Sequence, residues 1–159
     1  MSRERTIRVL RYSVIGMTLL TIILFALSVF TLVNGLSGTI SGGGFGLKLD
    51  KNGPNGDWIL RFSGSPRNTG FIGTSFFLQI GILDPDGQYI ALNSSAVDVP
   101  AGQERPFTVT LDIPYQAVQT YGLNQTQGSR AEFELIFSIK TLDGLVGLSQ
   151  TLRISGSPK

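Results

Sequence analysis

The 159-residue chain contains no cysteine and no histidine. It therefore lacks the commonest protein ligands for zinc, copper and haem, the cysteine nucleophile and the Ser-His-Asp arrangement. We expect no catalytic residue, no metal site and no cofactor. Without cysteine there are also no disulfides, so the hydrophobic core must stabilise any folded domain.

Neither positive nor negative charge is in clear excess over most of the chain. The sequence has 13 basic and 11 acidic residues, a formal net charge of +2. Four of the basic residues lie within residues 1–11, where only Glu4 opposes them: Arg3, Arg5, Arg8 and Arg11. A nearly neutral remainder has no electrostatic reason to bind nucleic acid, and we predict no such partner.

The longest apolar segment runs from Tyr12 to Val33 and contains no charged residue. A helix of this length, at ~1.5 Å per residue, crosses a hydrocarbon core of ~30 Å. The apolar region of a signal peptide is roughly 7–15 residues long and ends in a small-residue cleavage pattern, which is lacking around Leu36. Its polar side chains include four hydroxyls that can bond back to the same helix: Thr18, Thr21, Ser28 and Thr31. We predict an uncleaved transmembrane helix at residues 12–34.

The flanking charges predict the orientation of this helix. The four arginines precede it, and the first basic residue after it is Lys48. Positive charge remains on the cytoplasmic side during insertion. Residues 1–11 are therefore expected in the cytoplasm, and the chain from about Asn34 onward is expected outside the cell membrane.

Glycine and serine dominate residues 35–46, which include the sequence SGTISGGGFG. This composition is typical of a flexible linker, and we predict one here. A phosphate-binding glycine loop would need a preceding strand, a following helix and a Lys-Ser/Thr pair, none of which the sequence contains.

Residues 47–156 show a hydrophobic period of two, as in strands with one buried face. Strand segments are FGLKLD, DWILRFSG, GTSFFLQIGIL, QYIAL, FTVTLDI, AEFELIFSIK and the residues from Val146 to Ser155. In AEFELIFSIK the expected inward residues are Phe133, Leu135, Phe137 and Ile139, and the expected solvated ones Glu132, Glu134, Ser138 and Lys140. About seven short antiparallel strands indicate an all-β, immunoglobulin-like sandwich.

The breaks between these segments carry turn residues. DPDG, which starts at Asp84, has Pro and Gly where a type I turn prefers them. PYQAVQTYG favours one or two helical turns, with Pro114 at the start and Gly122 at the end. In SPRNTGF, Asn68 and Gly70 suit a sharp turn, and we expect Phe71 to pack back into the core.

Two pairs of carboxylates are candidates for chemistry. Asp84 and Asp86 match the start of a calcium loop, but Ser95 stands where the bidentate glutamate is required, so we predict a plain turn. Glu132 and Glu134 share a strand face at a spacing of about 6.5–7 Å. Glycosidases use carboxylate pairs as acid and base. With no aromatic substrate-binding cluster beside them, we predict two solvated side chains and no small-molecule substrate.

Two sequons lie on the side predicted to be translocated. They are Asn93-Ser94-Ser95 and Asn124-Gln125-Thr126, both expected in loops. We predict that Asn93 and Asn124 are possible N-glycosylation sites in an organism that has the machinery.

The turns NTGF, LDPDGQYIA and VPAGQERPFTVTLDIP, with the strands between them, resemble the late-embryogenesis/water-stress β-sandwich family. The resemblance covers Leu47 to Ser155. Similar domains follow single membrane spans in archaeal surface proteins. The resemblance implies a sandwich without catalytic residues, and hence a binding or structural role.

These observations favour a non-catalytic, single-span membrane protein whose extracytoplasmic sandwich binds a protein partner or another copy of itself. It would serve as an accessory subunit of a membrane complex or as a cell-surface anchor. The alternative is a subunit of an extracellular filament, in which GTISGGGFGLKLD is released by processing and completes a neighbouring sandwich. A third hypothesis is an enzyme or small-ligand receptor that uses Glu132 or Glu134.

Overall fold

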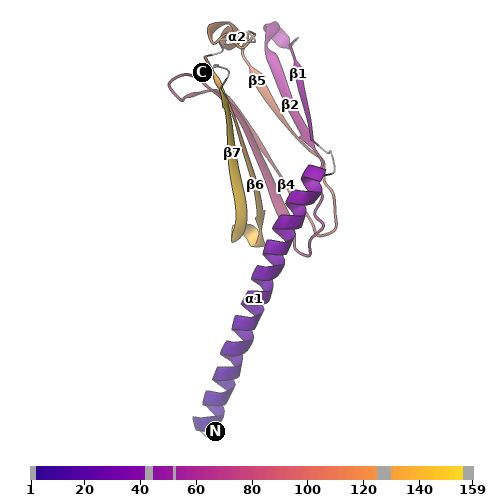
Figure 1. Ribbon diagram of the computed structural model, residues 1–159, viewed down its shortest axis with the longest axis vertical. Coiled ribbons are helices and arrows are strands. Elements are labelled where there is room, and N and C mark those ends of the chain that lie inside the picture. The colour runs from indigo at the N-terminus through magenta and orange to yellow at the C-terminus, as the bar shows by residue number, and fades with distance from the viewer. Residues whose placement is uncertain (1–2, 42–44, 52, 125–129, 156–159) are drawn as a thin grey trace.

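The computed structural model describes residues 3–41, 45–51, 53–124 and 130–155, and shows a long N-terminal helix attached to a two-layered β-sandwich (Figure 1). The helices are α1 (Arg3–Ser41) and α2 (Tyr115–Thr120), with short 3₁₀ turns at Pro54–Gly56 and Leu142–Gly144. The strands are β1 (Phe45–Asp50), β2 (Trp58–Gly64), β3 (Thr74–Leu83), β4 (Tyr89–Val99), β5 (Phe107–Ile113), β6 (Glu132–Thr141) and β7 (Val146–Ser155). The predicted all-β fold behind one apolar helix is confirmed.

The seven strands form two antiparallel sheets. One sheet has the order β1-β2-β5 and the other the order β4-β3-β6-β7. Alternate residues of β3 and β5 face each other between the sheets and make up the centre of the core. These buried residues include Phe76, Leu78, Ile80, Ile82, Phe107, Val109, Leu111 and Ile113, as the period of two predicted.

The predicted turns are confirmed at two places. At the β3–β4 connection the Asp84 carboxylate accepts hydrogen bonds from the backbone N–H groups of Asp86 and Gln88, at 3.0 and 2.8 Å. Gly87 follows with a φ of 79°, a conformation that favours glycine. Helix α2 occupies part of the predicted helical segment and ends just before Gly122.

Helix α1 contains one segment, Tyr12–Val33, that is long and apolar enough to cross a membrane. Only 11% of its most apolar part is buried, so it is not the core helix of the sandwich. Three hydroxyls bond back to the helix as predicted, since Thr18, Thr21 and Ser28 donate to the carbonyl four residues earlier at 2.8–2.9 Å. The helix therefore keeps these polar groups satisfied without help from water.

The helix is longer than the sequence predicted. It continues through residues 35–41, where we expected a flexible linker, and β1 already begins at Phe45. The linker prediction is therefore wrong for residues 35–41 and 45–46, while residues 42–44 lie outside the described part of the chain. Helical structure therefore extends past the apolar segment despite the low helix propensity of glycine and serine.

The end of the sandwich next to α1, which we call the base, consists of the loops at residues 65–73, 100–106 and 142–145. Ser28 and Thr31 of α1 have no exposed surface because the base covers them. Leu32 packs against the base end of the core, formed by Phe76, Val99 and Ile139. The last part of the apolar helical segment is thus joined to the folded domain.

Asn68 organises the loop of the base that touches the helix. Its side chain is fully buried, and its amide nitrogen donates to the carbonyl oxygens of Ile72 and Val99 at 2.8 and 2.9 Å. Its Oδ1 accepts a hydrogen bond from the N–H of Gly70 at 2.9 Å. The sharp turn predicted at Asn68 and Gly70 is therefore confirmed.

The prediction that Phe71 packs into the core is wrong. Its side chain is 70% exposed and stacks on Phe30 of α1, with 5.8 Å between ring centroids. The backbone N–H of Phe71 donates to Thr31 Oγ1 at 3.3 Å, and any side chain at Gly70 would collide with Thr31. This close approach of the loop to α1 directs Phe71 toward the helix.

Candidate interaction surface

The two long sides of the sandwich are built differently. On one side β4 and β5 lie next to each other, and Asn93 Nδ2 on β4 donates to the carbonyl of Thr110 on β5 at 2.6 Å. On the other side the edge strands are β1 and β7, and nothing comparable joins them in the described part of the chain. The sandwich is thus closed along β4 and β5 and open along β1 and β7 (Figure 1).

The open side exposes the inner faces of both edge strands. Leu47 and Leu49 pair with Phe62 and Leu60, so they lie on the face of the sheet that points into the sandwich. Yet their exposed fractions are 63% and 43%. In a closed sandwich such positions would be covered by the opposite sheet.

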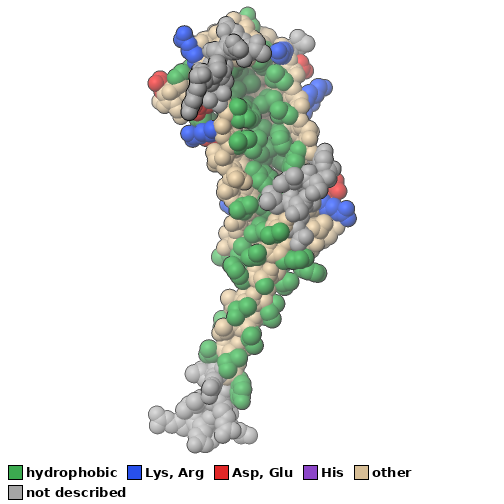
Figure 2. Space-filling view, in the orientation of Figure 1, with side chains coloured by type: hydrophobic (Ala, Val, Ile, Leu, Met, Phe, Trp, Pro, Cys, Tyr) green, Lys and Arg blue, Asp and Glu red, His purple; other side chains and the backbone are tan. Residues whose placement is uncertain are grey.

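Strand β7 shows the same property. Leu152 and Ile154 pair with the inward residues Leu135 and Phe133 of β6, but both are 53% exposed. Leu148, near the start of the strand, is 48% exposed. Together with β1, these side chains form an apolar groove, visible in Figure 2 as a band of hydrophobic side chains along the sandwich. The groove residues are Phe45, Leu47, Leu49, Leu148, Leu152 and Ile154.

The groove deepens at the end far from α1. A cavity of about 280 Å³ opens there between Leu49 of β1 and Ile154 of β7 and reaches Trp58 and Phe133. Nearer the base, the ring of Phe45 lies on that of Phe62, 5.3 Å between centroids, and so covers part of the core. The groove therefore offers an apolar floor between two strands whose outer backbone edges have no strand partner among the described residues.

The outer face of the four-stranded sheet carries a charged cluster that the sequence did not predict. Glu134 on β6 accepts hydrogen bonds from Tyr89 Oη at 2.5 Å and from Arg153 Nε at 2.6 Å. The Tyr89 ring reaches Glu134 from β4 by crossing β3 at Gly81, where a Cβ would come within 2.6 Å of the ring. This covering leaves only 2% of the Glu134 side chain exposed.

The prediction that Glu134 and Ser138 are solvated is therefore wrong. Both are buried, because β6 lies in the interior of its sheet and neighbouring side chains cover its outer face as well. Glu132 is half-buried and Lys140 is exposed. The inward residues Phe133, Leu135 and Phe137 pack against or beside the core as predicted.

The cluster has a structural role, because it joins side chains of β4, β6 and β7. The hydrogen bond from Tyr89 and the contact with Arg153 hold the pKa of Glu134 below its ordinary value, although burial acts in the opposite direction. The same hydrogen bond with Glu134 raises the pKa of Tyr89. A carboxylate that is ionised and engaged on both oxygens cannot serve as a general acid at neutral pH.

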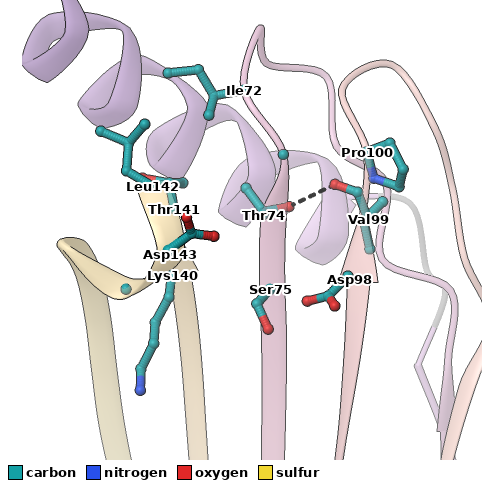
Figure 3. A pocket seen from close by; sticks show the side chains of 12 residues that line it. Ile72, Thr74, Ser75, Asp98, Val99, Pro100, Lys140, Thr141, Leu142 and Asp143 are labelled. Carbon is teal, nitrogen blue, oxygen red and sulfur yellow. Dashed lines mark hydrogen bonds between the residues drawn. The ribbon is translucent and has the colours of Figure 1, made fainter.

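A second depression, of about 820 Å³, lies at the end of the four-stranded sheet next to the base (Figure 3). Its charged lining residues are Asp98, Lys140 and Asp143, which come from β4, β6 and the β6–β7 turn. These groups point in different directions in Figure 3 and do not converge on one ligand. Thr74 Oγ1 donates to the carbonyl of Val99 at 3.4 Å and ties β3 to β4 there.

The sequon at Asn93 is not in a loop, contrary to the prediction. Asn93 lies within β4, and its amide is used in the hydrogen bond to Thr110 that ties β4 to β5. Asn124 is exposed in a turn, while Gln125 and Thr126 of its sequon lie outside the described residues. The side chains of Arg3, Arg5, Arg8 and Arg11 are likewise not described. Their role in topology, and glycosylation at either asparagine, stay predictions.

No family model and no curated protein matches the chain. Similar solved structures include a β-glucuronidase from glycoside hydrolase family 2, at 18% identity and a TM-score of 0.41 over 69% of this chain and 11% of that one. A protein from Archaeoglobus fulgidus matches at 11% identity and a TM-score of 0.41, over 69% of this chain and 91% of that one. A FixG-related protein from Vibrio parahaemolyticus matches at 12% identity and a TM-score of 0.39, over 69% and 92%.

At these identities the similarity concerns the β-sandwich fold alone. The chain spans about a tenth of the β-glucuronidase, 11% of its length. The resemblance to the late-embryogenesis/water-stress family stays a prediction.

Proposed function

We propose that this protein is a non-catalytic, single-span membrane protein whose extracytoplasmic sandwich binds a protein partner in the apolar groove between β1 and β7. It would act as an accessory subunit of a membrane complex or as a cell-surface anchor. The observation that carries the proposal is the exposure of inward-facing leucines on both edge strands, such as Leu47 and Leu152. Exposed apolar surface of this kind, beside open strand edges, is typical of interaction sites.

Retention of the helix supports the anchored form. A cleaved signal sequence has no reason to pack on the mature domain, but Thr31 and Ser28 are fully covered by the base. Removal of α1 would uncover Leu32's contacts with the core. The arginines before Tyr12 favour a cytoplasmic N-terminus.

The groove suits a β-strand better than a small molecule. It extends along strands of six and ten residues, and an added strand would find backbone partners on β1 or β7. Alternate apolar side chains of that strand would cover the groove residues. The partner is therefore expected to contribute an extended segment with apolar residues at every second position.

Native mass spectrometry of the full chain, extracted from its own membranes in mild detergent, tests this proposal. We expect the intact chain in complex with another protein. Leu152→Asp should abolish the complex, because it places a charge in the groove. Thr151→Asp is the matched control, since Thr151 is exposed on the opposite face of β7. Retention of the complex by Leu152→Asp would refute the groove as the binding site.

The alternative filament function draws support from β1. Every residue of this strand is exposed, so β1 is held by fewer contacts than the other strands of its sheet and is the segment best able to exchange with a neighbouring copy. The filament requires processing near Leu36 and release from the bilayer. A mature N-terminus near Leu36 in homopolymers would favour the filament, whereas an intact chain would exclude it.

A further inference from the structure

We infer that the base of the sandwich is seated in the outer interface of the same bilayer that α1 crosses, through the exposed side chains of Phe71 and Leu145. This inference rests on the proposed membrane anchor. It assigns a lipid-contacting surface to the folded domain and so limits how far the groove can tilt toward the membrane.

The position of the base along α1 is the first argument. The apolar segment Tyr12–Val33 has 22 residues, about 33 Å of helix, which matches a hydrocarbon core of ~30 Å. The base already covers Ser28, five residues before the end of that segment. The span below Ser28 is about 24 Å long, too short for the full core, so the outer part of the bilayer must meet the base.

Sliding the helix outward does not remove this overlap. The arginines before Tyr12 would then enter the hydrocarbon, where a charge costs about 2.5–3.5 kcal/mol or more. The inner boundary of the span is thus restrained by charge and the outer boundary by the folded base.

Two of the most exposed side chains of the base are apolar. Leu145 is 86% exposed, and Phe71 is 70% exposed and stacked on Phe30, a residue of the apolar span. Because Phe30 belongs to the span, its stacking partner lies at the depth of the outer leaflet boundary. Phenylalanine and leucine are among the side chains that interfacial segments bury at the boundary between headgroups and acyl chains.

The β6–β7 turn gives independent support. Leu142 and Asp143 have φ values of 50° and 52°, a conformation in which a hairpin normally carries glycine or asparagine. The turn nevertheless holds leucine at Leu142 and at Leu145, its most exposed apolar residue. A turn that only had to reverse the chain in water would not need two leucines.

Charge does not explain this contact. The base carries Arg67, Arg105, Glu104 and Asp143, with Asp98 and Lys140 at the adjoining strand ends, so both signs are present in similar number. The contact is therefore expected to be apolar and insensitive to anionic lipid.

Spin labels on the full chain test the proposed contact between the base and the membrane. The absence of native cysteine allows single-cysteine variants. Leu145→Cys and Phe71→Cys place labels in the base, Asp86→Cys places one in the β3–β4 turn at the opposite end, and Leu19→Cys places one within the span. The chain is reconstituted in phosphatidylcholine vesicles, and collision of each label with oxygen and with a water-soluble nickel chelate is measured.

We expect the labels at positions 71 and 145 to be several-fold more accessible to oxygen relative to nickel than the label at position 86. Added anionic lipid or salt should leave that ratio unchanged. A ratio that depends on either would overturn the proposal that the base contacts the membrane through apolar side chains. If the labels at positions 71 and 145 are exposed to water while the label at position 19 lies in the bilayer, the membrane contact of the base is refuted and the membrane anchor is retained. An aqueous label at 19 would refute the anchor itself.

Discussion

Strands β5 and β1 flank the same strand, β2, yet one is buried and the other is not. Their sequences, FTVTLDI and FGLKLD, alternate in the same way. The inward residues Val109 and Leu111 of β5 are 2% and 1% exposed, whereas Leu47 and Leu49 of β1 are 63% and 43% exposed. The difference lies across the sandwich, where β4 runs beside β5, whereas among the described residues no strand of the opposite sheet comes equally close to β1. The alternation of apolar and polar residues identifies the inward face of a strand. Only the opposing sheet decides whether that face is shielded from solvent.

The largest expected effect comes from truncating one leucine on each side. Leu111→Ala should lower the free energy of unfolding by about 2–5 kcal/mol, because it leaves a cavity in a packed core. Leu47→Ala should change it by about 0.5 kcal/mol or less, since the side chain is mostly solvated. Denaturant unfolding of the full chain measures both. Equal losses would mean that the groove is filled in solution, for example by self-association.

The charged cluster on the outer face is expected to have the next largest effect, since it ties β7 to the sheet on the open side. Glu134→Gln keeps the shape but removes the charge that Tyr89 and Arg153 contact. It should cost about 1–3 kcal/mol at neutral pH. Denaturant unfolding compares it with Glu132→Gln, which changes a half-buried glutamate on the same strand and should cost less.

The same cluster predicts a pH dependence. The pKa of Glu134 is lowered in the folded state, so its contribution to stability is fully present above its unfolded pKa, near 4.3, and is lost as the pH falls through the folded value. The protection factors of β7 amides, which correct for the pH dependence of intrinsic exchange, should therefore fall on acidification below about pH 4 in the native chain. Glu134→Gln should lack this acid-induced step, and an identical pH profile in the variant would contradict the assignment.

On the closed side, the hydrogen bond from Asn93 to the Thr110 carbonyl is expected to stabilise the contact of β4 with β5. Asn93→Ala should cost about 1 kcal/mol, the ordinary net value of one hydrogen bond. Thermal unfolding measures the loss. Ser94→Ala is a suitable control, because it changes the neighbouring residue of β4 and leaves the hydrogen bond from Asn93 to Thr110 in place. A loss shared by both variants would point to a general effect on β4.

The smallest effect on stability is expected in the groove. Leu148→Ser should change the free energy of unfolding by no more than about 0.5 kcal/mol, since Leu148 is 48% exposed. Binding of the hydrophobic dye ANS by the native chain should decrease, because the dye reports accessible apolar surface. Unchanged dye binding would indicate that the groove is already occupied.

Several local features followed from the sequence. The apolar span, the DPDG turn and the inward residues of β3 and β5 are all confirmed, because each depends on short-range chemistry or on a regular period. Even the back-bonding of Thr18 and Thr21 within the helix needed only the residue type and the helical geometry.

The errors concern contacts between distant residues. Glu134 is buried by Tyr89 only because Gly81, on the strand between them, leaves room for the ring. Phe71 points to α1 because Asn68 shapes its loop from within the base. No local pattern carries either relationship, since the partners are separated by tens of residues or act through a third element.

By itself the sequence determined an apolar span, with arginines before it, and a series of alternating strands behind it. Composition and period suffice for these features, because they reflect transfer of side chains out of water and the geometry of a single segment. Only the tertiary structure decided that β4 and β5 close one side while β1 and β7 leave the other open, and that the base reaches down onto α1. Those outcomes depend on which layers face each other, and a single strand's own residues do not contain that information.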